Sequence, residues 1–251
     1  ASDGASQAAV AQMTLPEHFE VLVVPHAPPQ TKPKALNYGL QFARGELVAI
    51  YDAEDVPARG QLRLAAETFA EAPSGIVCLQ ARLAFYNADE NWLTRQLAIE
   101  YAILYELMLP VLARQRLPLP LGGTSNHFRI QALRRLGAWD PHNVTEDADL
   151  GIRLHKAGYK TAIIDSTTFE EANSDLYNWI RQRSRWVKGY IQTWLVHMRH
   201  PVRLWRQMGW RSFASFQLRR SASTSASGVP QLHDLMVPSR IGSAPTSTSV
   251  R

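Results

Sequence analysis

LVAIYDAED, residues 47–55, is an apolar run that ends directly in a cluster of acids. A run of this length, bounded by turn-forming residues, is typical of a buried β-strand. Similar runs occur at 19–24 and 76–79, and amphipathic helical patterns at 31–45 and about 60–71 lie between them. Strands that alternate with helices predict an α/β fold with a mostly parallel sheet. In such sheets ligands bind at the carboxyl ends of the strands, where these acids fall.

The rest of the chain predicts further helices and one more strand. The patterns favour a long helix over 92–109, a helix that begins at Glu146 with Thr145 as its N-cap, and a strand at 161–164. From 179 to about 211 the sequence predicts two basic, aromatic helices, parted near Pro201.

Composition divides the chain into three parts. We expect residues 1–175 to form the α/β domain, 176–216 to form basic amphipathic helices, and 217–251 to be a disordered tail, because Ser, Thr, Ala, Gly and Pro dominate there. The single Cys78 excludes an intramolecular disulfide scaffold and a cysteine-rich zinc cluster. No run of about eighteen uncharged apolar residues occurs, so we expect no transmembrane helix in this chain. The chain begins at Ala1, and we expect it to be a piece of a longer protein.

The net charge of +5 is unevenly distributed. Residues 1–175 carry 15 Lys and Arg against 21 Asp and Glu, whereas residues 176–251 carry 12 against one. Five of the seven tryptophans also lie after residue 175. Mixtures of Trp and Arg suit the headgroup region of an anionic membrane, and an ordinary packed helical pair with a basic outer face is the alternative.

The acidic cluster is a candidate metal site. On an extended segment, Asp52 and Glu54 point the same way and can present two carboxylates to one cation, with Asp55 next to them. Such a cation would neutralise a diphosphate leaving group. The alternative is a solvated turn followed by a helix cap.

A second acidic group, TED at 145–147, begins the helix predicted from Glu146. A carboxylate there is stabilised by the helix dipole, which is one sufficient explanation. The other is that Asp147 is a general base for an attacking hydroxyl.

The third motif, QRSRW at 182–186, places Gln182 and Arg185 one helical turn apart. A guanidinium beside the indole of Trp186 suits a phosphate or the face of a sugar. A basic helix lying on the protein surface is the alternative.

These motifs, in this order, resemble the cellulose-synthase-like branch of the family-2 glycosyltransferases. The branch has DxD, TED and QxxRW motifs, which appear here as DAED, TED and QRSRW, with KPKALN at 32–37 and GGTSNHF at 122–128 in the expected intervals. The resemblance covers about residues 15–212 and implies a GT-A type nucleotide-binding fold. It implies inverting sugar transfer with Mg²⁺ or Mn²⁺, and it places the family's first strand upstream of residue 1.

The resemblance also implies residue roles. Asp147 would be the base, Lys34 would contact the donor nucleotide, and Asp52 with Glu54 or Asp55 would hold the metal and the donor diphosphate. The QxxRW residues Gln182, Arg185 and Trp186 would cover the diphosphate, and Trp186 would also contact the acceptor. The remaining acceptor contacts are assigned to the GGTS loop and the TED motif, namely Gly123, Thr124, Ser125 and Glu146.

We therefore expect a transferase that moves glucose from UDP-glucose onto a growing β-linked polysaccharide. Transfer of a single sugar to a lipid is the alternative, and an inactive truncated remnant is another. A different class of function is a further alternative, namely a basic module that binds a membrane or nucleic acid. Nucleic-acid binding does not require the TED and DAED motifs, so we expect no nucleic acid to bind. The expected location of the full-length protein is the cytoplasmic face of the inner membrane.

Overall fold

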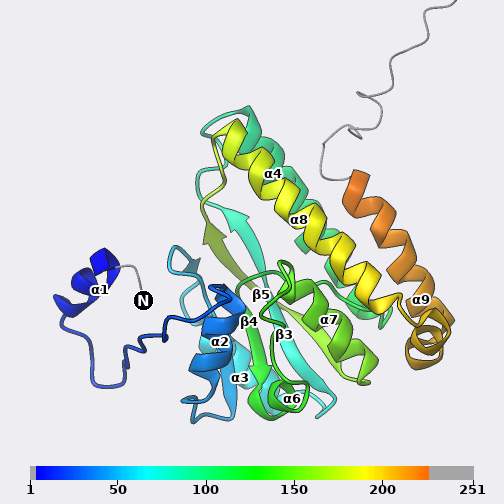
Figure 1. The fold of residues 1–251 in the computed structure, drawn as a ribbon, viewed down its shortest axis with the longest axis horizontal. Helices are drawn as coiled ribbons and strands as arrows, with labels where there is room; N and C mark the ends of the chain where they lie inside the picture. Colours follow the sequence, from blue (N-terminus) through cyan, green and yellow to red (C-terminus); the bar gives the residue numbers. More distant parts are fainter. Residues whose placement is uncertain (1–3, 226–251) are drawn as a thin grey trace, which may run out of the picture.

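A computed structural model describes residues 4–225 of the chain. Its centre is a mixed sheet in the order β1-β4-β3-β5-β2, flanked by helices (Figure 1). The strands are β1 Leu47–Ile50, β2 Val56–Pro57, β3 Ile76–Phe85, β4 Asn126–Arg129 and β5 Lys160–Glu170. The helices are α1 Gly4–Ala11, α2 Lys32–Leu40, α3 Gln61–Glu71, α4 Trp92–Ala102, the π-helix η1 Ile103–Met108, α5 Leu109–Arg114, α6 Ile130–Arg135, α7 Glu146–Lys156, α8 Leu176–His197 and α9 Pro201–Ser225.

The predicted α/β fold is confirmed, but the strand directions differ from the expected mostly parallel sheet. Among the described strands, β3 and β5 pair in parallel, and the other three pairings are antiparallel. The reason is β4, which runs antiparallel to both of its neighbours and is inserted between β1 and β3. Strand–helix alternation in sequence does not reveal such an insertion.

The strand predicted at 19–24 is wrong. This segment is extended but belongs to no strand, and Phe19, Val21 and Val23 are exposed. An apolar run with no neighbouring strand has nowhere to place its backbone hydrogen bonds within a sheet. In Figure 1 the segment links the outlying helix α1 to α2.

Packing on both faces of the sheet explains why most residues of β3 are apolar. Cys78 belongs to a core with Phe128 of β4 and Leu150 of α7, whereas Leu79 packs against Phe69 of α3. Successive side chains of a strand point to opposite faces, so one run supplies two cores. These two layers hold the strand ends in fixed positions.

The helical region after β3 is longer than predicted and contains a π-helix. The helix continues past Leu109 to Arg114, and η1 ends two residues before Pro110. Proline lacks an N–H and clashes with the carbonyl four residues earlier in a regular helix, so a wider turn is the natural accommodation. Helix α9 likewise continues beyond the expected boundary at Phe216 to Ser225, after a non-helical Gly209, and the rest of the predicted tail lies outside the described residues.

Candidate active site

The acidic segment after β1 is a turn rather than the extended segment expected from sequence. The Asp55 N–H donates to the Asp52 carbonyl at 3.2 Å, and one Asp55 carboxylate oxygen accepts from the Asp52 N–H at 2.7 Å. The Thr124 hydroxyl donates to the same Asp55 oxygen. The turn therefore brings Asp52 and Asp55 together, whereas Glu54 is exposed.

Lys32, and not the predicted Lys34, lies in this site. The Lys32 ammonium forms an ion pair with Asp52 and donates to the Gly123 carbonyl at 2.8 Å. Lys34 instead donates to the Ala27 carbonyl on an exposed surface. The two lysines are two residues apart on a helix, so they point in different directions.

Glu170, at the end of β5, lies with Asp52 and Asp55 and was not predicted from the sequence. Burial, together with the charges of Asp55, Asp52 and Glu54, raises the pKa of Glu170 to about 8. One carboxylate oxygen each of Glu170 and Asp55 is buried without a hydrogen-bond partner. Buried orphan oxygens in a cluster of negative charge fit a cation.

This donor set suits a divalent metal that is shared with a substrate. No group of three or more His, Cys, Asp or Glu side chains in ligating arrangement occurs within 4–225. Mg²⁺ is commonly bound by one or two carboxylates together with substrate phosphates, so a closed protein cage is not required. Asp52 and Asp55, with Glu170 behind them, fit this description.

The GGTS loop at 122–125 forms the floor next to the acids. The Gly122 N–H donates to the Gln80 side chain at 2.8 Å, and a Cβ built on Gly123 would lie 3.5 Å from an Asp147 oxygen. Gly123 and Thr124 therefore contact the acidic groups. Ser125 does not, because its buried hydroxyl donates to the Thr168 hydroxyl at 2.6 Å.

Asp147 lies in the first turn of α7, facing this loop. Burial, together with the charge of the neighbouring Glu146, raises the pKa of Asp147 to about 7. A hydrogen bond from the Ala148 N–H acts in the opposite direction and is included in this value. Burial also raises the pKa of Glu146, which lies within electrostatic reach of Lys32 and Asp52. A carboxylate with a pKa near 7 is matched to proton transfer at neutral pH. The side chains Asp52, Asp55, Glu146, Asp147 and Glu170 are called the acidic site below.

Helix α8 fixes the TED motif in place. A Cβ on Gly189 would meet the Thr145 side chain at 2.6 Å, so the helix and the motif are in close contact. The Thr193 hydroxyl accepts from the Asn143 amide at 2.9 Å and lies 3.3 Å from the Thr145 hydroxyl. Thr145 is the N-cap residue of α7, as expected, but its side chain contacts α8 and makes no cap hydrogen bond to its own helix.

The arginine of the QRSRW motif that the fold buries is Arg183. Its guanidinium pairs with Glu100 of α4 and lies over the Trp179 and Trp186 rings, at 5.5 and 5.1 Å from their centroids. Arg185 is exposed, and Gln182 is half-buried. The motif therefore joins α8 to α4 through Arg183.

Two tyrosines of the helix after β3 also face the acidic site. Burial raises the pKa of both Tyr101 and Tyr105, and the charges of Glu170 and Asp147 act on both phenols in the same direction. Tyr105 contacts the loop at Gly122. The two tyrosines are four residues apart and therefore lie on one face of the helix. This spacing is visible in the sequence, but the tyrosines were not among the predicted site residues.

Comparisons with known proteins show the family and the fold of this chain. The model of a family described as Glycosyl transferase family group 2 matches residues 47–239. Beta-monoglucosyldiacylglycerol synthases of Synechocystis sp. and Trichormus variabilis are 31% identical over 182 residues and 32% identical over 172 residues, and these matches cover 72% and 65% of this chain. The chain spans little more than a third of these curated relatives, 37% and 35% of their lengths.

A solved structure shares the fold. The mannosyltransferase of Pyrobaculum calidifontis, in complex with GDP-Man and Mn²⁺, superposes with a TM-score of 0.52 at 18% identity, covering 85% of this chain and 70% of that one. This likeness shows an α/β fold of the GT-A type. The chain belongs to glycosyl transferase family group 2. Membership of the cellulose-synthase-like branch stays a prediction, since the relatives named above are lipid glucosyltransferases by their names.

Proposed function

We propose that this chain carries the catalytic domain of an inverting glycosyltransferase that moves a hexose, glucose from UDP-glucose in the first instance, onto a lipid acceptor of the diacylglycerol type. The observation that carries the proposal is the acidic site, in which a carboxylate with a pKa near 7 lies next to carboxylates with unpartnered buried oxygens. The names of the relatives support a lipid acceptor in preference to the polysaccharide expected from the sequence.

The residues divide the reaction between its two ends. Asp147 accepts the proton of the acceptor hydroxyl as that oxygen attacks the anomeric carbon, and burial together with the Glu146 charge keeps the pKa of Asp147 high. Asp52 and Asp55 would hold Mg²⁺ or Mn²⁺, which neutralises the diphosphate leaving group when bound. Lys32, already paired with Asp52, adds a positive charge at the same end.

The remaining assigned residues keep supporting roles in the proposal. Gly123 and Thr124 line the site on the loop side. Gln182 and Trp186 lie on α8, and their contacts with donor and acceptor stay predictions. Lys34, Glu54, Ser125 and Arg185 lie away from the acidic groups or outside the contacts described, so their roles stay predictions. The cytoplasmic membrane face also stays a prediction.

The experiment is a calorimetric titration of UDP into the folded chain, with and without Mn²⁺. We expect Mn²⁺-dependent binding that Asp55→Asn weakens at least about tenfold, since a carboxylate ligand is lost. Glu54→Gln is the matched control, one residue away but exposed, and should change binding less than about twofold. Loss of binding in Glu54→Gln alone would move the metal ligand to Glu54, and no UDP binding by folded wild type would overturn the transferase proposal.

Product size then separates the two acceptors. With UDP-glucose, membrane lipid and Mn²⁺, a lipid transferase gives one organic-extractable glucoside, whereas a polymerase gives a water-soluble or insoluble ladder of long chains. A ladder would restore the polysaccharide acceptor that is expected from the resemblance.

A further inference from the structure

The helix formed by α4, η1 and α5 has two contrasting faces. Its inner face packs into the domain through Leu97, Tyr105 and Leu109, and Tyr101 and Tyr105 reach the acidic site. Its outer face is hydrophobic and exposed. The exposed residues that recur every fourth position are Ile99, Ile103, Leu107 and Val111, called the outer stripe below.

The π-helix keeps this stripe in line. In a regular α-helix, residues four apart rotate by about 40° around the axis, so a stripe of four such residues would drift by about 120°. A π-helix has a wider turn and therefore less rotation per residue. Because η1 spans Ile103–Met108, it offsets part of this drift in the middle of the stripe.

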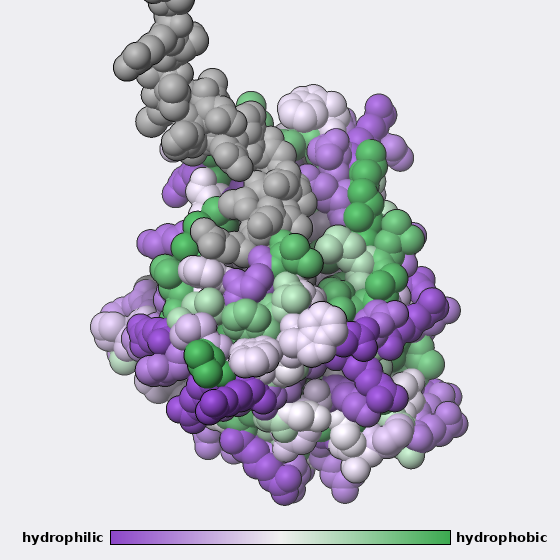
Figure 2. All heavy atoms as spheres, turned by 90° about the vertical axis from the view of Figure 1, so that its right-hand side faces the viewer, coloured by the Kyte–Doolittle hydropathy of each residue, from purple (hydrophilic) through white to green (hydrophobic). Residues whose placement is uncertain are grey.

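The helix is more apolar than its burial explains. Within the described part of the chain, Trp92–Arg114 is the one helix long and apolar enough to cross a membrane by length and composition, yet only 17% of its most apolar window is buried. A core helix of a soluble domain would be mostly buried. Figure 2 shows hydrophobic side chains gathered beside strongly hydrophilic ones on the upper part of the face that it displays.

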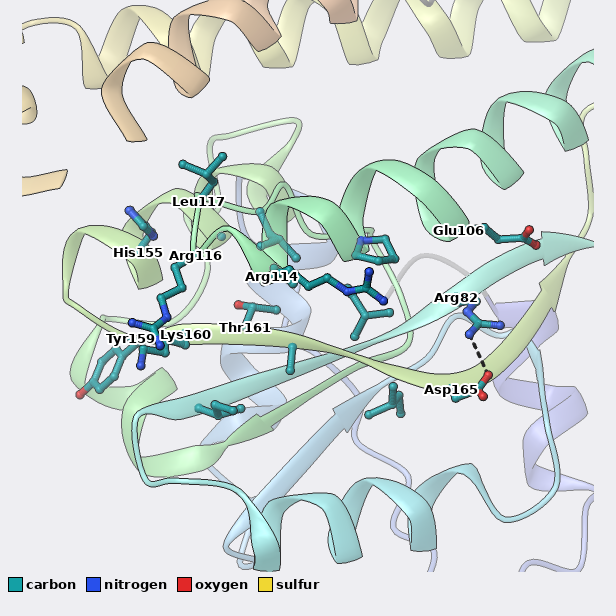
Figure 3. Close-up of a pocket in the computed structure, with 18 of the residues that line it drawn as sticks. Arg82, Glu106, Arg114, Arg116, Leu117, His155, Tyr159, Lys160, Thr161 and Asp165 are labelled. Atoms are coloured by element: carbon teal, nitrogen blue, oxygen red, sulfur yellow. Dashed lines mark ion pairs between the residues drawn. The ribbon is translucent and has the colours of Figure 1, made fainter. Parts of the chain in front are cut away.

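Positive charge lies at the carboxyl end of the stripe. A groove of about 940 Å³ runs between α5 and β5, and Arg114, Arg116 and Lys160 line it (Figure 3). Arg82 in the same groove is already paired with Asp165 at 2.8 Å. Glu106 is the acid that borders the groove from the helix itself. A hydrophobic stripe that ends in cations matches the acyl and phosphate layers of an anionic bilayer.

We infer that the outer stripe docks this domain onto an anionic phospholipid bilayer, with Arg114 and Arg116 at the level of the lipid phosphates. The inference rests on the proposed function, because the same helix then forms a wall between bilayer and acidic site. A lipid acceptor could reach Asp147 past Tyr101 and Tyr105 with its acyl chains still in the membrane. This surface is separate from the basic, aromatic helices for which the sequence predicts membrane contact.

The test is flotation of the 251-residue chain with vesicles of phosphatidylcholine containing phosphatidylglycerol. Ile103→Gln/Leu107→Gln should lower the vesicle partition coefficient at least about tenfold, because two apolar side chains lose their insertion. Single substitutions give a matched pair: Leu107 and Leu62 are 61% and 60% exposed, and Leu62 lies on α3. Leu107→Gln should weaken binding several-fold and Leu62→Gln should not.

A second pair of substitutions tests the positively charged end of the outer stripe. Arg114→Gln/Arg116→Gln should weaken binding to the anionic vesicles and leave the weaker binding to pure phosphatidylcholine unchanged. Unchanged flotation of Ile103→Gln/Leu107→Gln would overturn the inference. The inference would also be overturned if the wild-type chain were a dimer and this variant became a monomer without losing vesicle binding. UDP titration of the same samples separates this from the proposed function, since the variants should bind UDP with Mn²⁺ normally.

Discussion

Asp147 and Glu170 are carboxylates whose pKa values are raised chiefly by burial, and the local geometry gives them different uses. Asp147 lies in the first turn of α7 with one oxygen engaged by the Ala148 N–H. Glu170 has an orphan oxygen and three neighbouring acids. Groups with perturbed pKa values that converge on one place are candidates for chemistry, and here one suits proton transfer and the other cation binding.

The first prediction concerns Asp147→Asn. It should lower kcat by about 10²–10⁴-fold, because the amide cannot accept the acceptor proton. UDP binding with Mn²⁺ should stay within about twofold of wild type. In wild type, kcat/KM should rise with pH through about 7 and then level off, because only the ionised carboxylate is a base. Steady-state rates at pH 5.5–8.5 check this, and normal turnover in the variant would remove Asp147 from the reaction.

At the scale of elements, α8 holds the TED motif and α7 in position. It contacts the TED motif at Gly189 and Thr193, pairs with α4 through Arg183, and holds α7 through a His197–Asp149 hydrogen bond of 2.8 Å. Burial alone would raise the pKa of Asp149, but the hydrogen bond from His197 and the charge of Arg153 lower it overall. The helix is therefore a brace for α7, and its fit is set by a glycine.

Gly189→Ala tests this brace. A methyl group there would lie 2.6 Å from the Thr145 side chain, so α7 must move or the helices must separate, and overpacking of this kind costs about 1–3 kcal/mol. We expect a lower Tm and a loss of kcat. Gly39→Ala is the matched control: Gly39 lies in α2 with open space around it, and alanine there should stabilise by about 0.5–1 kcal/mol. Equal effects in the two variants would show that Gly189 has no positioning role.

At the scale of the whole molecule, the buried acids act on stability as well as on binding. A raised carboxyl pKa means that the folded chain binds a proton more tightly than the unfolded chain does. Stability is therefore present at low pH and is lost as pH rises from the ordinary Glu value of 4.5 towards the folded value of about 8. A cation bound in the site would reverse this loss.

Glu170→Gln should accordingly stabilise the metal-free chain at pH 8. We expect a Tm gain of about 2–4 °C at pH 8 in EDTA, corresponding to about 1 kcal/mol, that shrinks as pH falls towards 4.5. Added Mn²⁺ should raise the Tm of wild type more than that of the variant. Thermal melts across this pH range check both statements, and a gain that is independent of pH would contradict the assigned cause.

Much of the fold was predictable from sequence because it depends on local patterns. The apolar run at 47–50, the helix from Glu146 and the two helices parted at Pro201 lie where periodicity and proline put them. Lys32 and Lys34 show the limit: both belong to one motif, yet only tertiary contacts with Asp52 and Gly123 decide which lysine enters the site. Glu170 could not be found because it is far from every other acid of the site in sequence.

What the sequence determined by itself is the class: an α/β chain with three ordered motifs that carry carboxylates, guanidinium groups and an indole, and a basic stretch after residue 175. What only the tertiary structure decided is which atoms meet. The turn at 52–55 joins Asp55 to Asp52, β4 enters the sheet antiparallel, and the helix after β3 turns two tyrosines inward and an apolar stripe outward. Motifs record residue types in order, whereas direction, burial and pairing arise when segments distant in sequence pack together.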